Sequence, residues 1–225
     1  MNSRLIVHHL EQSRSHRIVW MMEELGVDYD MVEHKRHPKT KRAGKELRAI
    51  HPLGKAPMVV LPDGAVLAES GAILEELVEL YGPQLRPIAT DVEQMRRYRY
   101  FMHYAEGSLM PPLLVKLILS MLSKPPVPAI ARPLTRGIAA AVDKQFTDPE
   151  IELQLRFLDG ELASRTYVCG DLFTAADIQL SFPLDAGSSR ADLSRYPNVG
   201  RYLERLRARP AWQRATEKAG AFTGL

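Results

Sequence analysis

The hydrophobic period of the chain changes once, near residue 82, and this change limits the possible folds most strongly. Before it, short strand-like apolar runs alternate with helical ones, and after it the apolar spacing is helical throughout. Such a pattern predicts a mixed α+β unit followed by an all-helical unit. We therefore expect two domains, residues 1–82 and residues 91–225. The Gly- and Pro-rich segment 83–90 is expected to link them.

The predicted elements before residue 82 follow the order β-α-β-α-β-β-α. Pro62-Asp63-Gly64 separates two short apolar runs and is a strong hairpin signal. The last helix of this unit should turn Ile73, Leu77 and Leu80 inward. The predicted strands span 4–10, 27–34, 57–61 and 65–68, and the predicted helices span 13–26, 40–50 and 70–82.

Helical spacing of apolar side chains continues in the second unit. It runs from residue 92 to residue 109, where Pro111-Pro112 is expected to break or kink the helix. Further helices are predicted around 151–162, 197–207 and 210–219.

Composition excludes several classes of function. The 225 residues are 45% apolar and 25% charged, with 30 basic and 27 acidic residues, which is typical of a soluble globular protein. A net charge of +3 gives little support for a nucleic-acid or membrane partner, and we interpret the basic run 33–45 as a solvated face. The most apolar segment, 113–122, is shorter than the roughly 20 residues that span a bilayer.

The single cysteine, Cys169, excludes an internal disulfide, CxxC redox chemistry and a cysteine-rich metal site. We interpret it as a small buried hydrophobic residue and expect no metal. No secretory signal is visible at the N-terminus, so a reducing cytoplasm is the expected location.

The stretch "GKAPMVVLPDGAVLAES", residues 54–70, combines three features that suit one kind of ligand. Pro57 begins a strand, and a cis bond before it would leave the backbone of Met58 free to pair with an extended peptide. Ser70 and the helix it begins offer a carboxylate site, and Glu69 could hold an ammonium group. Taken one by one, the same features are also those of an ordinary hairpin, a rigid turn and an N-cap.

Two motifs together resemble the glutathione transferase family. They are "HPLGKAPMVVLPDGAVLAESGAI" at 51–73 and "GDLFTAADI" at 170–178, and the resemblance covers nearly the whole chain. It implies a thioredoxin-like β-α-β-α-β-β-α domain, an all-helical C-terminal domain and a homodimer. Thr174 and Asp177 match the family's buried capping motif. The segments 5–26 and 103–113 look most like bacterial and fungal members.

The resemblance also implies which residues bind glutathione. Ala56-Pro57 would be the cis-proline turn, with Met58 pairing its backbone with the cysteinyl part. Glu69 and Ser70 would bind the γ-glutamyl end. The whole implied set is Gln12, His51, Lys55, Ala56, Pro57, Met58, Glu69 and Ser70.

For two residues of this set, the resemblance implies a less specific role in glutathione binding. Lys55 stands where a basic residue lies near the glycine carboxylate. His51 stands where Asn is common in the family.

Glutathione must react as a thiolate, although a free thiol has a pKa near 8.5. Family members supply a Tyr or Ser hydroxyl near the end of the first strand, or a Cys. No Tyr precedes Tyr29, and no Cys precedes Cys169, so Ser13 and Ser15 are the candidates. Ser13 precedes Arg17 by four residues, as in serine-type members, and we expect it to be the donor with Ser15 behind it.

Other assignments stay open at this site. Ser13 could be an N-cap only, and Gln12 or Arg14 could supply the activating contact instead.

The electrophile is expected between the domains, near the bend before Pro111-Pro112. The resemblance places Met102, His103, Tyr104 and Met110 there, although such residues at helical spacing also form plain cores. The expected activity is conjugation of the glutathione thiolate to small hydrophobic electrophiles. A glutathione-dependent peroxidase or disulfide reductase, and a non-catalytic module for protein association, are the alternatives.

Overall fold

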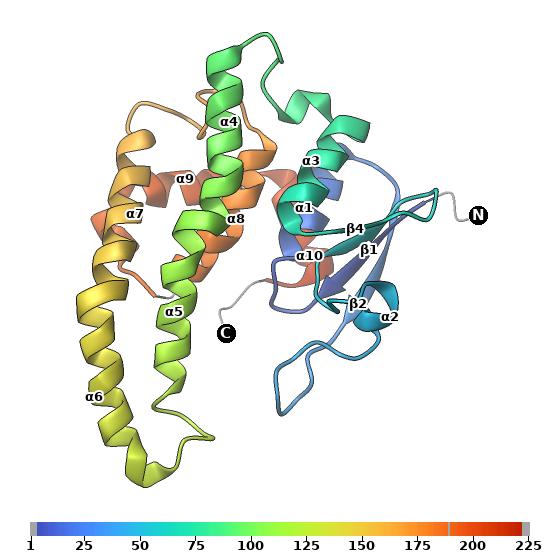
Figure 1. The fold of residues 1–225 in the computed structure, drawn as a ribbon. Coiled ribbons are helices and arrows are strands. Elements are labelled where there is room, and N and C mark those ends of the chain that lie inside the picture. The colour runs from blue at the N-terminus through green and yellow to red at the C-terminus, as the bar shows by residue number, and fades with distance from the viewer. Residues whose placement is uncertain (1–3, 189, 222–225) are drawn as a thin grey trace.

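The computed structural model describes residues 4–188 and 190–221. Its first part has the predicted order β-α-β-α-β-β-α, which confirms the α+β, thioredoxin-like expectation (Figure 1). The elements are β1 (Leu5–Leu10), α1 (His16–Leu25), β2 (Tyr29–His34), α2 (Leu47–Ile50), β3 (Met58–Val60), β4 (Val66–Ala68) and α3 (Ser70–Tyr81).

The four strands form one mixed sheet in the order β2-β1-β3-β4. β1 runs parallel to β2 and antiparallel to β3, and β3 pairs antiparallel with β4. The predicted hairpin joins β3 to β4. Its Asp63 carboxylate accepts a hydrogen bond from the backbone N–H of Ala65 at 2.9 Å, and Gly64 adopts φ 91°.

Helices α1 and α3 pack on each other and against α8 of the helical part. Seven consecutive residues of α1, from His16 to Met22, are buried, because the helix lies between the sheet and the helical part. Two expectations were wrong in this part. Leu80 is 49% exposed on α3, and the helix expected over 40–50 forms only in its last four residues.

The described residues after α3 are mainly helical, as predicted. They contain α4 (Val92–Tyr104), α5 (Met110–Met121), α6 (Arg132–Val142), α7 (Asp148–Glu161), α8 (Ala175–Ser188), α9 (Pro197–Arg207) and α10 (Pro210–Ala219). None of the helices within the described ranges is long and apolar enough to cross a membrane.

We expected Pro111-Pro112 to break or kink the helix, but the helical path does not break there. A π-helical segment, Ala105–Leu109, follows α4 directly, and Pro111 and Pro112 then occupy the first turn of α5. The helical path is continuous here, because the backbone N–H of Met110 donates to the Ala105 carbonyl, although Pro111 and Pro112 themselves have no N–H to donate. The π segment places Glu106 at the junction with the first part of the chain, where it meets α1.

A buried carboxylate organises the start of α8. The Asp177 carboxylate accepts hydrogen bonds from the backbone N–H of Thr174 at 2.8 Å and of Val168 at 3.1 Å. The Tyr202 hydroxyl on α9 donates to it at 2.7 Å. Burial raises the pKa of Asp177, and these donors offset part of that rise. Asp177 therefore joins α8, α9 and the preceding loop.

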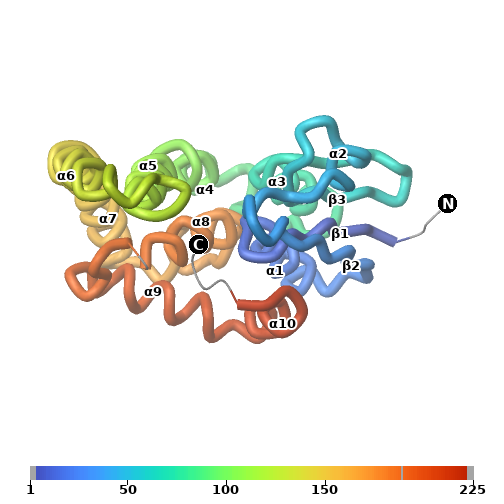
Figure 2. Tube along the Cα trace, turned by 90° about the horizontal axis from the view of Figure 1, so that it is seen from below, coloured from blue at the N-terminus to red at the C-terminus, as the bar shows by residue number. Residues whose placement is uncertain are grey.

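The last helix, α10, packs against the first helix, α1 (Figure 2). Glu23 on α1 accepts from Arg214 and Lys218, and Glu24 on α1 accepts from Arg209. The chain therefore returns to its first unit after forming the helical one. The division at 1–82, 83–90 and 91–225 stays a prediction.

Candidate active site

A cleft opens between the two parts of the molecule. It consists of three adjoining compartments of about 450, 550 and 340 Å³. Arg14, which lies just before α1, lines all three compartments, so they belong to one site. Ser13, Lys55 and Ala56 line the first, His103 and Ser70 the second, and Ser70 also the third.

The two candidate serines occupy different positions. Ser13 is 7% exposed and lines the first compartment, whereas Ser15 is fully buried behind it. Their hydroxyl oxygens lie 2.7 Å apart, and the Ser13 hydroxyl also accepts from the backbone N–H of Ser15 at 3.2 Å. α1 begins at His16 with Ser15 as its N-cap residue, so Ser13 is not the N-cap.

Ser15 holds the end of β1 in place. Its hydroxyl accepts from the backbone N–H of Leu10 at 3.0 Å and lies 3.1 Å from the Leu10 carbonyl oxygen. It also lies 2.9 Å from Nδ1 of His9. Because Ser15 touches Ser13 as well, the position of the Ser13 hydroxyl is fixed by β1.

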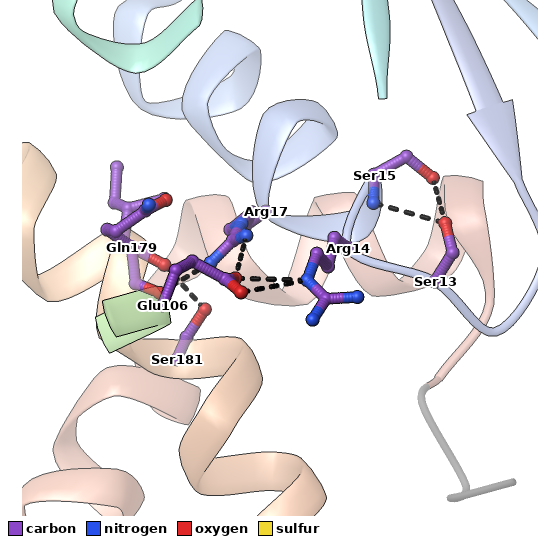
Figure 3. Close-up of polar contacts among 8 residues, drawn as sticks. Ser13, Arg14, Ser15, Arg17, Glu106, Gln179 and Ser181 are labelled. Atoms are coloured by element: carbon purple, nitrogen blue, oxygen red, sulfur yellow. Dashed lines mark hydrogen bonds and ion pairs between the residues drawn. The ribbon is translucent and has the colours of Figure 1, made fainter. Parts of the chain in front are cut away.

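An ion-pair cluster joins the two parts of the molecule beside the cleft (Figure 3). Glu106 accepts from Arg17 at 2.5 Å and from Nε of Arg14 at 3.0 and 3.1 Å. Arg17 is 1% exposed and donates its other terminal nitrogen to the Gln179 carbonyl at 2.7 Å. The cluster thus fixes Arg14, the residue shared by all compartments.

Burial and charge oppose each other in this cluster. Burial lowers the pKa of Arg17 to about 10, although Glu106 counteracts it, so Arg17 stays charged at neutral pH. Burial alone would raise the pKa of Glu106, but Arg17 and Arg14 lower it below its ordinary value. The cluster therefore carries a fixed positive excess beside the cleft.

Glu69 and Ser70 lie where the second and third compartments meet. Glu69 adopts φ 70°, a conformation that is costly for a residue other than glycine and that clusters at functional sites. Ser70 begins α3 and is 5% exposed. Met102 and His103 from α4 line the second compartment with them. An acid, a hydroxyl and a helix N-terminus therefore converge here.

The third compartment contains the turn before β3. His51, Lys55, Ala56 and Pro57 line it, and the peptide bond between Ala56 and Pro57 is cis. The expectation that the Met58 backbone is free to pair with a ligand was wrong. Met58 has a fully buried side chain, and it lies in β3 between His8 of β1 and Ala68 of β4, so its backbone does not form a free edge.

Of two residues predicted to bind the electrophile, Met110 lines the cleft and Tyr104 does not. Met110 lines the first compartment. Tyr104 does not line any of the three compartments, and we correct its assignment. It is 3% exposed, and its hydroxyl donates to the Gln154 carbonyl at 2.9 Å, so it belongs to the packing between α4 and α7.

Sequence reasoning missed several residues of the first compartment. Most positions of the basic run 33–45 are exposed, as expected, but Arg36 and Arg42 also line the wall of this compartment. Arg36 is held there by the carbonyl oxygens of Glu11 and Gln12. The remaining missed residues that line it are Leu10, Ala43, Gly44, Arg48, Leu53, Gly54, Leu114, Leu117, Phe182, Ala186 and Arg190.

Two further residues singled out in the sequence, Gln12 and Cys169, lie at different depths. Gln12 lines the first compartment, and its side-chain amide donates to the Ala221 carbonyl at 2.8 Å. Cys169 is buried, as expected. Within residues 4–188 and 190–221, the structure has no group of three or more His, Cys, Asp or Glu side chains suited to a metal ion.

Comparison with known proteins places this cleft in context. The model of the "Glutathione S-transferase, N-terminal domain" matches residues 13–80, and that of the "Glutathione S-transferase, C-terminal domain" matches residues 112–210. Glutathione S-transferase 3 of Schizosaccharomyces pombe is 40% identical over 216 residues, which is 95% of this chain and 87% of the relative. The chain belongs to the glutathione S-transferase family.

Other members of the glutathione S-transferase family match over similar lengths. Glutathione S-transferase 1 of Saccharomyces cerevisiae is 30% identical over 96% of this chain and 95% of its own. A crystal structure of a glutathione S-transferase from Actinobacillus pleuropneumoniae has a TM-score of 0.80 and 32% identity, covering 97% of this chain and 94% of that one. The recognition of the family and of its enzymatic class is thereby confirmed. The serine-type assignment and the individual site residues stay predictions.

Proposed function

We propose that this enzyme binds glutathione in the cleft and transfers its thiolate to small electrophiles. The observation that carries the proposal is the convergence of Ser13, the Ala56–Pro57 turn and the Glu69–Ser70 pair on compartments that share Arg14.

Binding is assigned part by part. Glu69 takes the ammonium of the γ-glutamyl end, and Ser70 with the N-terminus of α3 takes its carboxylate. Lys55, with His51 nearby, takes the glycine carboxylate. Ala56 replaces Met58 as the backbone that pairs with the cysteinyl part, because Ala56 lines the cleft and Met58 does not.

This placement brings the thiol to Ser13. A hydroxyl that donates to the sulfur favours its charged form, and cations around the cleft act in the same direction. The thiolate then attacks an electrophilic carbon held beside it, so the reaction gains from proximity and from a stabilised nucleophile.

The electrophile compartment has two different walls. One is apolar and includes Met110, Leu117 and Phe182, and the other is cationic and includes Arg42 and Arg190. No carboxylate within the described ranges lies at ion-pair distance from either of these arginines. We infer that the electrophile has an apolar body, as predicted, and that one with an anionic end is preferred. A pair of acceptors that differ only as acid and methyl ester tests this preference.

The serine assignment is tested by Ser13→Ala, with the exposed Ser194→Ala as the matched control. A hydrogen bond to a charged group contributes about 1.5–3 kcal/mol, so we expect kcat/KM to fall roughly 10- to 100-fold for Ser13→Ala. Ser194→Ala should retain full activity. Equal activity of both variants would refute the role of Ser13.

The alternatives make different predictions. Higher turnover of an organic hydroperoxide or a small disulfide than of an aryl halide would favour peroxidase or reductase activity. Absence of glutathione binding would favour a non-catalytic association module.

A homodimer, a cytoplasmic location and a role in detoxification are part of the same proposal. Ile130, Leu134 and Ile138 are four residues apart and 92, 70 and 53% exposed, so a second copy could cover an apolar row at α6. Sedimentation of the wild type and of Leu134→Glu tests this contribution. A dimer that persists unchanged in the variant would exclude this row from the interface.

A further inference from the structure

A buried histidine is connected to the candidate thiolate donor by two hydrogen bonds. His9 lies in β1 and is 1% exposed, and its Nδ1 is 2.9 Å from the Ser15 hydroxyl. The Ser15 hydroxyl is 2.7 Å from that of Ser13. We call these three side chains the Ser13–Ser15–His9 chain. None of the roles assigned above uses His9.

The partner of the other ring nitrogen fixes the proton on His9. Nε2 lies 3.1 Å from the carbonyl oxygen of Ala219 at the end of α10. A carbonyl oxygen only accepts, so Nε2 carries the proton, and in the neutral ring Nδ1 must then accept. Burial lowers the pKa of His9, so the ring is neutral at pH 7.

The directions of the remaining hydrogen bonds follow from this assignment. Ser15 has one proton, and its nearer acceptor is Nδ1 of His9 at 2.9 Å, compared with 3.1 Å for the Leu10 carbonyl. The Ser15 oxygen accepts from the backbone N–H of Leu10, so its remaining lone pair accepts the Ser13 proton. Before glutathione ionises, the Ser13 proton therefore points inward, and a lone pair of Ser13 is left for the cleft.

We propose that the Ser13–Ser15–His9 chain accepts the thiol proton of bound glutathione and stores it on His9. This inference rests on the proposed function, because it needs the thiol beside Ser13. The thiol proton moves to the Ser13 oxygen, the Ser13 proton to Ser15, and the Ser15 proton to Nδ1 of His9. No proton is lost or gained, and the products are a thiolate and an imidazolium.

The transfer reverses each hydrogen bond in the chain. Protonated His9 donates to Ser15, Ser15 donates to Ser13, and Ser13 then donates to the thiolate. Every proton has an acceptor before and after the transfer, and Nε2 keeps its bond to Ala219 throughout. Thus the proton movement that creates the thiolate also turns Ser13 into the donor that stabilises it.

Charged groups on three sides of His9 influence this step. Glu33 on β2 and Glu11 after β1 favour the imidazolium, whereas His34 on β2 opposes it. On α1, burial and, to a smaller extent, the nearby His9 lower the pKa of His16 to about 4, so His16 stays neutral. The Ala219 carbonyl of α10 favours the imidazolium as well. The two carboxylates and the carbonyl counteract the cost of charging a buried ring.

The test compares thiolate formation with proton release at pH 7. Thiolate is measured by the ultraviolet absorbance of bound glutathione, and proton release by calorimetry in buffers with different ionisation enthalpies. S-Methylglutathione has no thiol, so subtracting its proton release removes the contributions of the carboxylates and the amine. The wild type should release well under one proton per thiolate formed.

His9→Gln keeps a polar side chain that cannot take up the proton, and it should release one proton per thiolate. His8→Gln is the matched control, because His8 directly precedes His9 in β1 and contacts His34 instead of Ser15. His8→Gln should behave as the wild type does.

The outcomes separate the two proposals. One proton released per thiolate in the wild type would overturn the role of His9 and leave the proposed function intact. Glutathione binding without thiolate formation, or no binding, would overturn both. The wild-type measurement decides the question even if His9→Gln fails to fold.

Discussion

Removing the charge of Glu106 should destabilise the protein strongly, because it leaves a buried cation without its anion. In Glu106→Gln, Arg17 remains 1% exposed and charged, and it retains the Gln179 carbonyl as a partner. Its Nε has no hydrogen-bond partner within the described residues even in the wild type. The substitution therefore separates the effect of charge from that of shape.

The expected magnitude follows from the burial of the two partners. Breaking a buried ion pair by removing one partner costs about 3–5 kcal/mol. Glu106 is 31% exposed and the new amide can still accept a hydrogen bond, so we expect a smaller loss, about 2–4 kcal/mol. For a protein of this size that loss lowers Tm by roughly 4–16 °C.

Urea and thermal unfolding of the ligand-free protein measure this loss. Glu152→Gln is the matched control, since Glu152 also accepts from two arginines, Arg156 and Arg195, but on the surface. Exposed pairs of this kind contribute little, so the control should unfold close to the wild type. Equal losses in both variants would refute the argument from burial.

Three further predictions concern other parts of the molecule. Burial raises the pKa of the Cys169 thiol to about 12, so a thiol reagent should modify Cys169 only as fast as the protein unfolds, and rapid labelling of the native state would contradict this. Burial acts to raise the pKa of Glu23, but hydrogen bonds from Lys218, Tyr29 and Arg214 together lower it below 4.5. The stability that the Glu23 carboxylate contributes is present above pH 4.5 and is lost as the pH falls through the pKa of Glu23 in the folded protein. The difference in unfolding free energy between the wild type and Glu23→Gln should therefore narrow in acid. Asp177→Asn should cost about 3 kcal/mol in urea unfolding, and a loss near zero would show that the buried carboxylate is not needed.

The order of the secondary-structure elements was predictable because its signals are local. Each signal is contained in a few neighbouring residues, as shown by the apolar periods, the Pro62-Asp63-Gly64 turn and the capping pair Thr174 and Asp177. The same locality explains the errors. Helical spacing alone cannot distinguish Tyr104, which packs against α7, from Met102, which lines the cleft.

The contacts that complete the site depend on distant segments. Glu106 meets Arg14 across 92 positions of sequence, and His9 meets Ala219 across 210. These long-range contacts form because α10 packs against α1 and the π segment meets the start of α1. No local sequence pattern predicts this packing. Met58 shows the same limit, since the availability of its backbone depends on the strands that flank β3.

The return of α10 to α1 also determines when the site can exist during synthesis. A chain leaving the ribosome forms its N-terminal parts first. β1, Ser13 and Ser15 emerge early, but the carbonyl that fixes the ring of His9 belongs to Ala219 and emerges 210 residues after His9. A nascent chain could therefore fold most of its sheet and helices long before it could activate a thiol. On our proposal, thiol activation through His9 begins only after α10 has been synthesised.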